Sequence, residues 1–124
     1  MIKKTNVNDI ILEKKDVIKH NDGNILKLEK FGNINDIKVK EIYFTEIYFN
    51  KIKGWKKHKE MTCKLSIPYG KVKFVFFDDN KKFLDIIIQD DNFSSITIPP
   101  NIWFAFKGLN KDKSIIINLS NKLH

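Results

Sequence analysis

The chain contains no arginine: all 23 of its basic residues are lysine. Nucleic-acid sites rely on arginine for bidentate contacts with bases and phosphates, and no run of adjacent lysines here is longer than two. We therefore expect no nucleic-acid partner, and keep a lysine-rich surface that binds DNA or RNA as an alternative. Lysine does hold phosphate well as a point charge. The net charge of +8 thus favours a pocket for an anionic small molecule.

The chain also has one cysteine, Cys63, and therefore no internal disulfide and no thiolate zinc site. Its histidines, His20, His58 and His124, lie far apart and show no metal-ligand spacing. No apolar run approaches the roughly 18 residues that a membrane span needs, and the N-terminal segment lacks the apolar region of a secretory signal. These absences predict a cytoplasmic protein with no membrane association, no metal and no cofactor.

A chain of 124 residues buries one core, so we expect a single domain over residues 1–124. No segment shows a helical apolar stripe. Short segments rich in β-branched and aromatic residues instead alternate with turn signals such as His-Asn-Asp-Gly and Pro-Pro-Asn. We expect strands within residues 8–19, 24–30, 38–50, 56–65, 71–77, 83–89, 95–98, 102–106 and 114–119. This spacing is typical of an all-β sandwich or barrel.

The segment 38–50, KVKEIYFTEIYFN, is dense in isoleucine, tyrosine, phenylalanine and threonine, which suit a pleated, half-buried surface. Both of its faces are apolar. The segment is therefore predicted to be a central strand that is covered on both sides, in part by a partner subunit.

The stretch 52–78 is the only part of the chain in which polar, reactive side chains recur along strand-like segments. A Pro-Tyr-Gly turn divides it, which predicts a hairpin-like pair of strands that line a pocket. If residues 56–65 are extended, Lys56, His58 and Lys64 share one face. Their order therefore makes these three side chains candidates for one site.

Ammonium groups gathered on one face are costly to bury unless an anion neutralises them. Lys71 and Lys73 continue the alternation beyond the turn, so one arrangement points several lysines and His58 at one cavity. Such a cluster suits an electrostatic clamp on a phosphate or on a developing enolate. Two alternatives stay open: the lysines form a solvated sheet face, and the histidine is a hydrogen-bonded structural residue.

Two segments carry a family resemblance: Lys-Gly-Trp-Lys-Lys-His at 53–58, followed by Lys64-Leu65, and Ile-Pro-Pro-Asn-Ile-Trp-Phe-Ala-Phe at 98–106. In this order they resemble the dTDP-4-dehydrorhamnose 3,5-epimerase family of the cupin superfamily, and more specifically its short relatives in bacterial surface-polysaccharide gene clusters. The resemblance covers roughly residues 24–120. It implies a cupin-type β-jelly roll, a homodimer whose N-terminal strands pair across the interface, and no metal.

The resemblance also implies a chemistry. A proton is abstracted next to the 4-keto group of a nucleotide-activated sugar and returned from the other face, which requires a base, an oxyanion stabiliser and an acid. His58 is the expected base or acid, and Lys56 and Lys64 are expected to stabilise the enolate. The expected substrate-binding residues are Lys53 (on the diphosphate), Trp55, Lys73, Trp103 and Asn118. Trp103 has a second interpretation as a core residue.

The sequence departs from the family pattern at several positions. Lys56 stands where the family has its histidine base, and the family tyrosine acid falls near Ile117 or Asn118. The aspartate that orients the histidine belongs to a C-terminal region that has no counterpart in this sequence. We therefore expect either an epimerase-like enzyme or a catalytically inactive accessory module that binds a sugar nucleotide or a glycan.

Overall fold

The computed structural model describes residues 5–30 and 38–124. This part of the chain is built from antiparallel strands and two short 3-10 helices. The elements are η1 (Val7–Asp9), β1 (Ile11–Lys14), β2 (Val17–Ile18), β3 (Ile25–Leu26), β4 (Glu41–Tyr48), β5 (Ile52–Lys56), β6 (Cys63–Tyr69), β7 (Lys71–Phe77), β8 (Phe83–Gln89), η2 (Asp90–Asn92), β9 (Ser94–Ile98), β10 (Trp103–Gly108) and β11 (Lys113–Ser120). None of its helices is long and apolar enough to cross a membrane.

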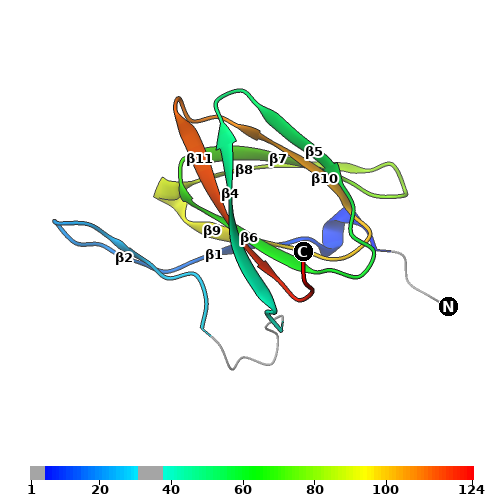
Figure 1. Ribbon diagram of the computed structural model, residues 1–124, viewed down its shortest axis with the longest axis horizontal. Coiled ribbons are helices and arrows are strands. Elements are labelled where there is room, and N and C mark those ends of the chain that lie inside the picture. Colours follow the sequence, from blue (N-terminus) through cyan, green and yellow to red (C-terminus); the bar gives the residue numbers. More distant parts are fainter. Residues whose placement is uncertain (1–4, 31–37) are drawn as a thin grey trace.

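Two sheets face each other around one core, and Figure 1 looks down the resulting barrel. The first has five strands in the order β1-β9-β6-β11-β4, and the second has four in the order β5-β10-β7-β8. The short strands β2 and β3 form a separate hairpin that reaches away from the barrel (Figure 1). The prediction of an all-β jelly roll is confirmed.

The core follows from period-two patterning along the strands. In β7, Val72, Phe74 and Phe76 are fully buried, while the residues between them face outward. Phe76 and Phe74 lie opposite Phe104 and Phe106 of β10, so aromatic pairs fill the space between the sheets. Burying such a side chain contributes about 1.5–3 kcal/mol. The aromatics of β10 are divided between its two faces, because Phe104 and Phe106 are buried and Trp103 is only partly buried.

The expectation of a central strand at 38–50 is wrong for the described chain, while cover of its second face by a partner subunit stays a prediction. Strand β4 is the edge of the five-stranded sheet, because it pairs with β11 alone. Its inward residues are partly or fully buried, whereas Ile42 and Phe44 are 53% and 66% exposed on the other face. The aromatic and β-branched residues that suggested two covered faces therefore include an uncovered apolar surface.

The expected hairpin within 52–78 is also wrong. Strand β5 ends at Lys56 and belongs to the four-stranded sheet, and residues 57–62 carry the chain across to β6 in the other sheet. Strands β6 and β7 follow each other through a tight turn yet lie in different sheets. Gly70 has a φ of +100° at this turn, and a Cβ there would lie 2.3 Å from Ser114 Oγ. Only glycine fits this close crossing between the sheets.

Candidate functional site

An open cavity of about 510 Å³ lies between β4 and β5. These strands are the free edges of the two sheets, so the cavity marks the place where the barrel wall is not closed by backbone pairing. The residues that line it are Tyr43, Phe44, Thr45, Glu46, Tyr48, Lys53, Lys56 and His124. The cavity therefore combines cationic side chains with two phenols, a carboxylate and an imidazole.

Strand β5 supplies the two lysines. Lys56 lies opposite Phe104 and Lys53 opposite Phe106, so both side chains share the inward face of β10. Between them, Gly54 has a φ of +143°, and a Cβ there would lie 2.5 Å from the Cβ of Ala105. The glycine thus allows β5 to lie against β10 at the irregularity that brings both lysines to one side.

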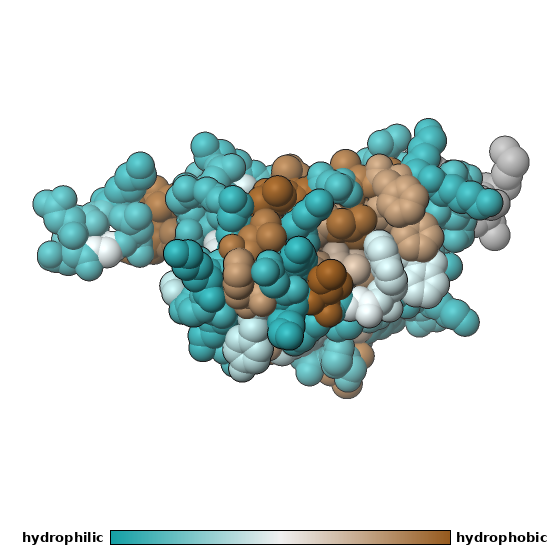
Figure 2. Space-filling model, turned by 90° about the horizontal axis from the view of Figure 1, so that it is seen from above, coloured by the Kyte–Doolittle hydropathy of each residue, from teal (hydrophilic) through white to brown (hydrophobic). Residues whose placement is uncertain are grey.

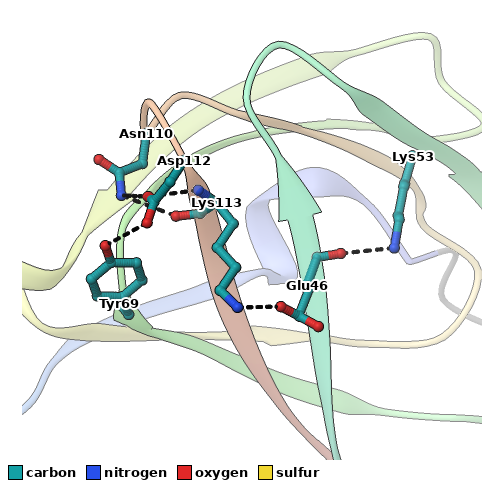
Figure 3. A network of polar contacts seen from close by, with 6 residues as sticks. All are labelled: Glu46, Lys53, Tyr69, Asn110, Asp112 and Lys113. Carbon is teal, nitrogen blue, oxygen red and sulfur yellow. Dashed lines mark hydrogen bonds and ion pairs between the residues drawn. The ribbon is translucent and has the colours of Figure 1, made fainter.

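The surroundings of the two lysines differ. Lys53 Nζ donates to the backbone oxygen of Glu46 at 2.8 Å, across the gap to β4 (Figure 3). Lys56 has no carboxylate within ion-pair distance among residues 5–30 and 38–124. An unpaired ammonium group beside a cavity is suited to an anionic ligand.

A polar network holds the end of β4 beside Lys53 (Figure 3). The Glu46 carboxylate accepts from Lys113 Nζ at 2.7 Å, and this hydrogen bond raises the pKa of Lys113. Asp112 accepts from the backbone N–H of Lys113 and from the Tyr69 hydroxyl, which lowers the pKa of Asp112. The network fixes the backbone to which Lys53 binds.

His58 lies two residues after the end of β5, on the inner side of the wall beside Phe104. Its backbone oxygen accepts from Asn101 N at 2.7 Å, and its ring centroid lies 6.2 Å from that of Phe104. Burial lowers the pKa of His58, and the charges of Lys56 and His124 lower it further. The imidazole is therefore neutral at neutral pH and able to accept a proton.

Two residues of this site were not predicted from the sequence. Tyr43 on β4 packs against the ring of His124, with centroids 4.8 Å apart. Burial raises the pKa of Tyr43, and the nearby groups of Cys63 and Glu41 raise it further. The signal that could have identified Tyr43 is the alternation Glu-Tyr-Thr at every second residue of β4, which points polar groups inward along one face.

Of the expected site residues, Lys53 and Lys56 line the cavity, His58 lies two residues after Lys56, and Asn118 lies on β11. Asn118 lies between Leu65 and Tyr43 in the sheet and is therefore on the inner face. Its Nδ2 already donates to the Tyr43 backbone oxygen, to Thr45 Oγ1 and to the Ile116 backbone oxygen. Asn118 thus anchors β4 to β11 beneath Tyr43.

Lys64 does not share a face with Lys56, so that expectation is wrong. Along β6 the inward positions are Cys63 and Leu65, which places Lys64 on the outer face of the five-stranded sheet. There its Nζ lies 2.6 Å from Glu29 Oε2, and both side chains are nearly buried. The prediction fails because residues 56–65 are not one continuous strand: β5 ends at Lys56 and β6 begins at Cys63.

Three further expected residues lie on the outer face of the four-stranded sheet. Trp103 stacks on Phe77 at a centroid distance of 6.0 Å, and Trp55 meets the same ring edge-on at 5.1 Å. Lys73 lies on the same strand face as Phe77 and is 3.7 Å from Asp85. These residues form an aromatic and ionic surface on the far side of the wall from Lys56. The interpretation of Trp103 as a core residue does not hold, since its side chain packs outside the barrel.

Comparison with solved structures gives the fold. A dTDP sugar isomerase from Desulfovibrio desulfuricans G20 matches with a TM-score of 0.88 at 23% identity, over 95% of this chain and 80% of that one. The sugar 3,4-ketoisomerase QdtA from Thermoanaerobacterium thermosaccharolyticum matches with a TM-score of 0.80 at 18% identity, over 95% and 84%. The rmlC epimerase of Mycobacterium tuberculosis matches with a TM-score of 0.81 at 12% identity, over 95% and 66%.

The chain has the cupin-type fold of the dTDP-sugar isomerases and epimerases. No family model matches the sequence, and no curated protein matches it. The expected jelly roll is thus established by the shape of the chain.

Proposed function

We propose that this barrel is an isomerase that binds a nucleotide-linked 4-keto sugar between β4 and β5 and moves a proton at the carbon next to the keto group. The observation that carries the proposal is the place of Lys56 on the cavity wall, as an ammonium group without a carboxylate partner among the described residues; its charge also helps to lower the pKa of nearby His58. A mutant of QdtA, one of the similar structures, is in complex with TDP-4-keto-6-deoxyglucose. That ligand has the chemistry that this arrangement suits.

The roles follow from position and charge. His58 takes the proton from carbon, and Lys56 stabilises the negative charge that then develops on the keto oxygen. Lys53, on the same inner face, binds the diphosphate as a point charge. The same first step begins both epimerisation and keto transfer, so it defines the reaction class.

The test follows the carbon-bound proton. Purified protein is incubated in heavy water with TDP-4-keto-6-deoxyglucose, and deuterium incorporation is measured by NMR. The wild type is expected to incorporate deuterium next to the keto group, and His58→Asn to lose this exchange while its melting temperature stays close to that of the wild type. His20→Asn, in the exposed hairpin turn, is the matched control and should exchange normally. Wild-type protein that exchanges no deuterium contradicts the proposal.

A second candidate is a sugar-nucleotide-binding module without catalysis. It is supported by the pairing of Lys64 with Glu29 outside the barrel, since an expected oxyanion stabiliser is then absent from the cavity. The two candidates differ in one result. The binding module would gain thermal stability with the nucleotide sugar and still exchange no deuterium.

We further propose that the protein is a homodimer. The β2–β3 hairpin extends from the barrel with Ile18 and Ile25 exposed (Figure 1), and Ile42 and Phe44 are uncovered on the edge strand β4. Figure 2 shows hydrophobic groups gathered on the face seen from above. An unpaired edge strand is a template for pairing with another chain, and large exposed apolar patches mark interaction sites. We also propose that the protein is cytoplasmic, as expected from the sequence.

Light scattering after gel filtration tests the dimer. Phe44→Lys is expected to convert the dimer to a monomer. Phe83→Lys places the same charge on an equally exposed phenylalanine of the other sheet and should leave the dimer intact. A wild-type monomer at all concentrations tested would refute this part of the proposal.

A further inference from the structure

The outer face of the four-stranded sheet carries one aromatic side chain from each of its strands. Trp103 of β10 lies opposite Phe77 of β7, and Phe77 lies opposite Phe83 of β8. These three rings are stacked, with centroids 6.0 and 5.4 Å apart. Trp55 of β5 meets the Phe77 ring edge-on at 5.1 Å. The four residues form one aromatic row across the sheet.

The two ends of the aromatic row are open. Trp55 and Phe83 belong to the edge strands β5 and β8, and no described strand lies beyond either of them in this sheet. Trp55 is 48% exposed and Phe83 65%. Trp103 is already engaged, because Lys57 Nζ lies 5.6 Å from its ring centroid in a cation–π contact. Trp55 and Phe83 are therefore the rings that a ligand can reach.

Lysines form a second row on the same face. Lys107 and Lys73 lie opposite each other, four residues beyond the aromatic row, and Lys71 follows at the next outward position. Lys73 has Asp85 as a partner at 3.7 Å. Lys71 and Lys107 have no carboxylate within ion-pair distance in the described parts of the chain. This lysine row is therefore positively charged, with three ammonium groups against one carboxylate.

The two rows together define the chemistry of a ligand. The side of an aromatic ring carries partial negative charge, which attracts the C–H groups on the face of a sugar ring. An unpaired ammonium group attracts a carboxylate. Four residues of strand separate the rows by about 13 Å, which is more than one sugar ring spans. An oligosaccharide that carries acidic groups fits both rows at once.

A nucleic acid fits the face less well. In single-stranded nucleic-acid sites, basic groups follow the phosphates beside the aromatic side chains on which the bases stack. Here the groups beside the aromatic row include two carboxylates. Asp79 lies 3.7 Å from Lys57, and Asp85 is two residues from Phe83 on the same strand face. These carboxylates would repel the phosphate of a stacked base.

We propose that the outer face of the four-stranded sheet binds an acidic oligosaccharide. Its sugar rings stack on Trp55 and Phe83, and its carboxylates bind Lys71 and Lys107. The site lies on the opposite side of the barrel wall from the cavity between β4 and β5. The inference therefore does not rest on the proposed function, and either can fail without the other.

The chain provides its own probe of this face. Its two tryptophans, Trp55 and Trp103, both belong to the aromatic row. Titration of the wild type with tetragalacturonate should therefore change the tryptophan fluorescence saturably, and calorimetry should give the same affinity. Saturating TDP should leave this affinity unchanged. Competition between TDP and tetragalacturonate would place the sugar in the cavity and overturn the proposal.

Removal of the exposed rings tests the aromatic row. Trp55→Ala and Phe83→Ala should each weaken binding of tetragalacturonate about tenfold. Their melting temperatures should stay close to that of the wild type, because both side chains are exposed. Phe44→Ala removes an equally exposed phenylalanine from the other sheet and should keep the wild-type affinity. Unchanged affinity in both Trp55→Ala and Phe83→Ala overturns the proposal.

Removal of the unpaired charges tests the lysine row. The double variant Lys71→Gln, Lys107→Gln should weaken binding of tetragalacturonate about tenfold at low salt and remove most of its salt dependence. Its affinity for the neutral sugar maltotetraose should not change. The double variant Lys19→Gln, Lys27→Gln removes the same charge from the region of the β2–β3 hairpin and should bind as the wild type does.

Two further probes decide what the face recognises. Polyglutamate carries carboxylates without sugar rings and should bind much more weakly than tetragalacturonate. Binding of equal strength would mean that the lysines attract any polyanion, which overturns the assignment to a sugar. Tighter binding of a short oligothymidylate would assign the face to nucleic acid and overturn it as well. A wild type that gives neither fluorescence change nor heat with tetragalacturonate refutes the proposal directly.

Discussion

The lysines on the two sides of the barrel wall differ in their partners. On the outer surface, Lys57, Lys64, Lys73 and Lys113 each lie within 4 Å of a carboxylate oxygen, on Asp79, Glu29, Asp85 and Glu46. On the inner face, Lys53 has only a backbone carbonyl and Lys56 has no carboxylate among the described residues. The charges of these four outer lysines are thus balanced by neighbouring carboxylates. The inner charges are left for an anion that the protein must obtain from solution.

The largest effect is expected where an outer lysine is nearly buried. Glu29→Gln leaves the ammonium group of Lys64 beside a neutral amide, with its side chain only 8% exposed. Breaking a buried ion pair by removing one partner costs about 3–5 kcal/mol. Urea unfolding should show this loss as a lower midpoint with an unchanged slope.

The double variant Lys64→Met, Glu29→Leu provides the matching control. Replacing a buried pair by apolar residues of similar volume is often neutral or stabilising, so its stability should return close to that of the wild type. A loss below about 1 kcal/mol in Glu29→Gln alone would show that water reaches Lys64. Burial would then no longer distinguish the outer Lys64 from the inner lysines.

The inner face should respond in the opposite way. Lys56→Met removes a charge that no described carboxylate balances, so the free energy of unfolding without ligand should stay the same or rise slightly. In the wild type, a nucleotide sugar at a hundredfold excess over its dissociation constant should add about 2.7 kcal/mol and raise the melting temperature by several degrees. Lys56→Met should lose most of this shift. Lys57→Met, next in the chain but outside, should keep it.

The fold could be predicted because local patterns decide it. Alternation such as Val72-Lys73-Phe74 and rigid turns such as Pro99-Pro100 are visible in the sequence, and each is sufficient to define a strand or its end. The pairing of strands could not be predicted in the same way. Whether β6 pairs with β7 or with β9 and β11 depends on contacts between distant residues, and the pattern of either strand alone is compatible with both.

The site could be predicted only in part for the same reason. Lys56 and His58 could be identified because they are close in sequence, at the end of β5 and two residues after it. Lys64 was misplaced because six residues without strand pairing separate β5 from β6, and the period of two does not continue through them. Tyr43 and His124 were missed because their proximity arises from the register of β4 with β11 and from the tethering of residue 121 to residue 62.

A smaller effect of the inner charges should appear in the titration of His58. Its pKa is lowered in the folded state by burial, by Lys56 and by His124, whereas the unfolded chain has the ordinary value near 6.5. Stability from this group is therefore complete above about pH 6.5 and is lost as the pH falls toward the folded pKa, because the unfolded state binds the proton first. NMR titration of Lys56→Met should show a higher pKa for His58. An unchanged value would mean that Lys56 points away from the imidazole.

The smallest effect is expected for Lys73, which the sequence placed among the ligand-binding residues. Its ion pair with Asp85 spans 3.7 Å, and the two side chains are 41% and 56% exposed. Such surface pairs contribute about 0.2–1 kcal/mol, so Lys73→Gln should barely change the urea midpoint and should keep the full melting shift with a nucleotide sugar. A lost shift would mean that the outer face of β7 binds the ligand. An outer lysine would then bind the anion despite its neighbouring carboxylate. This is the reverse of what we expect for the outer and inner lysines.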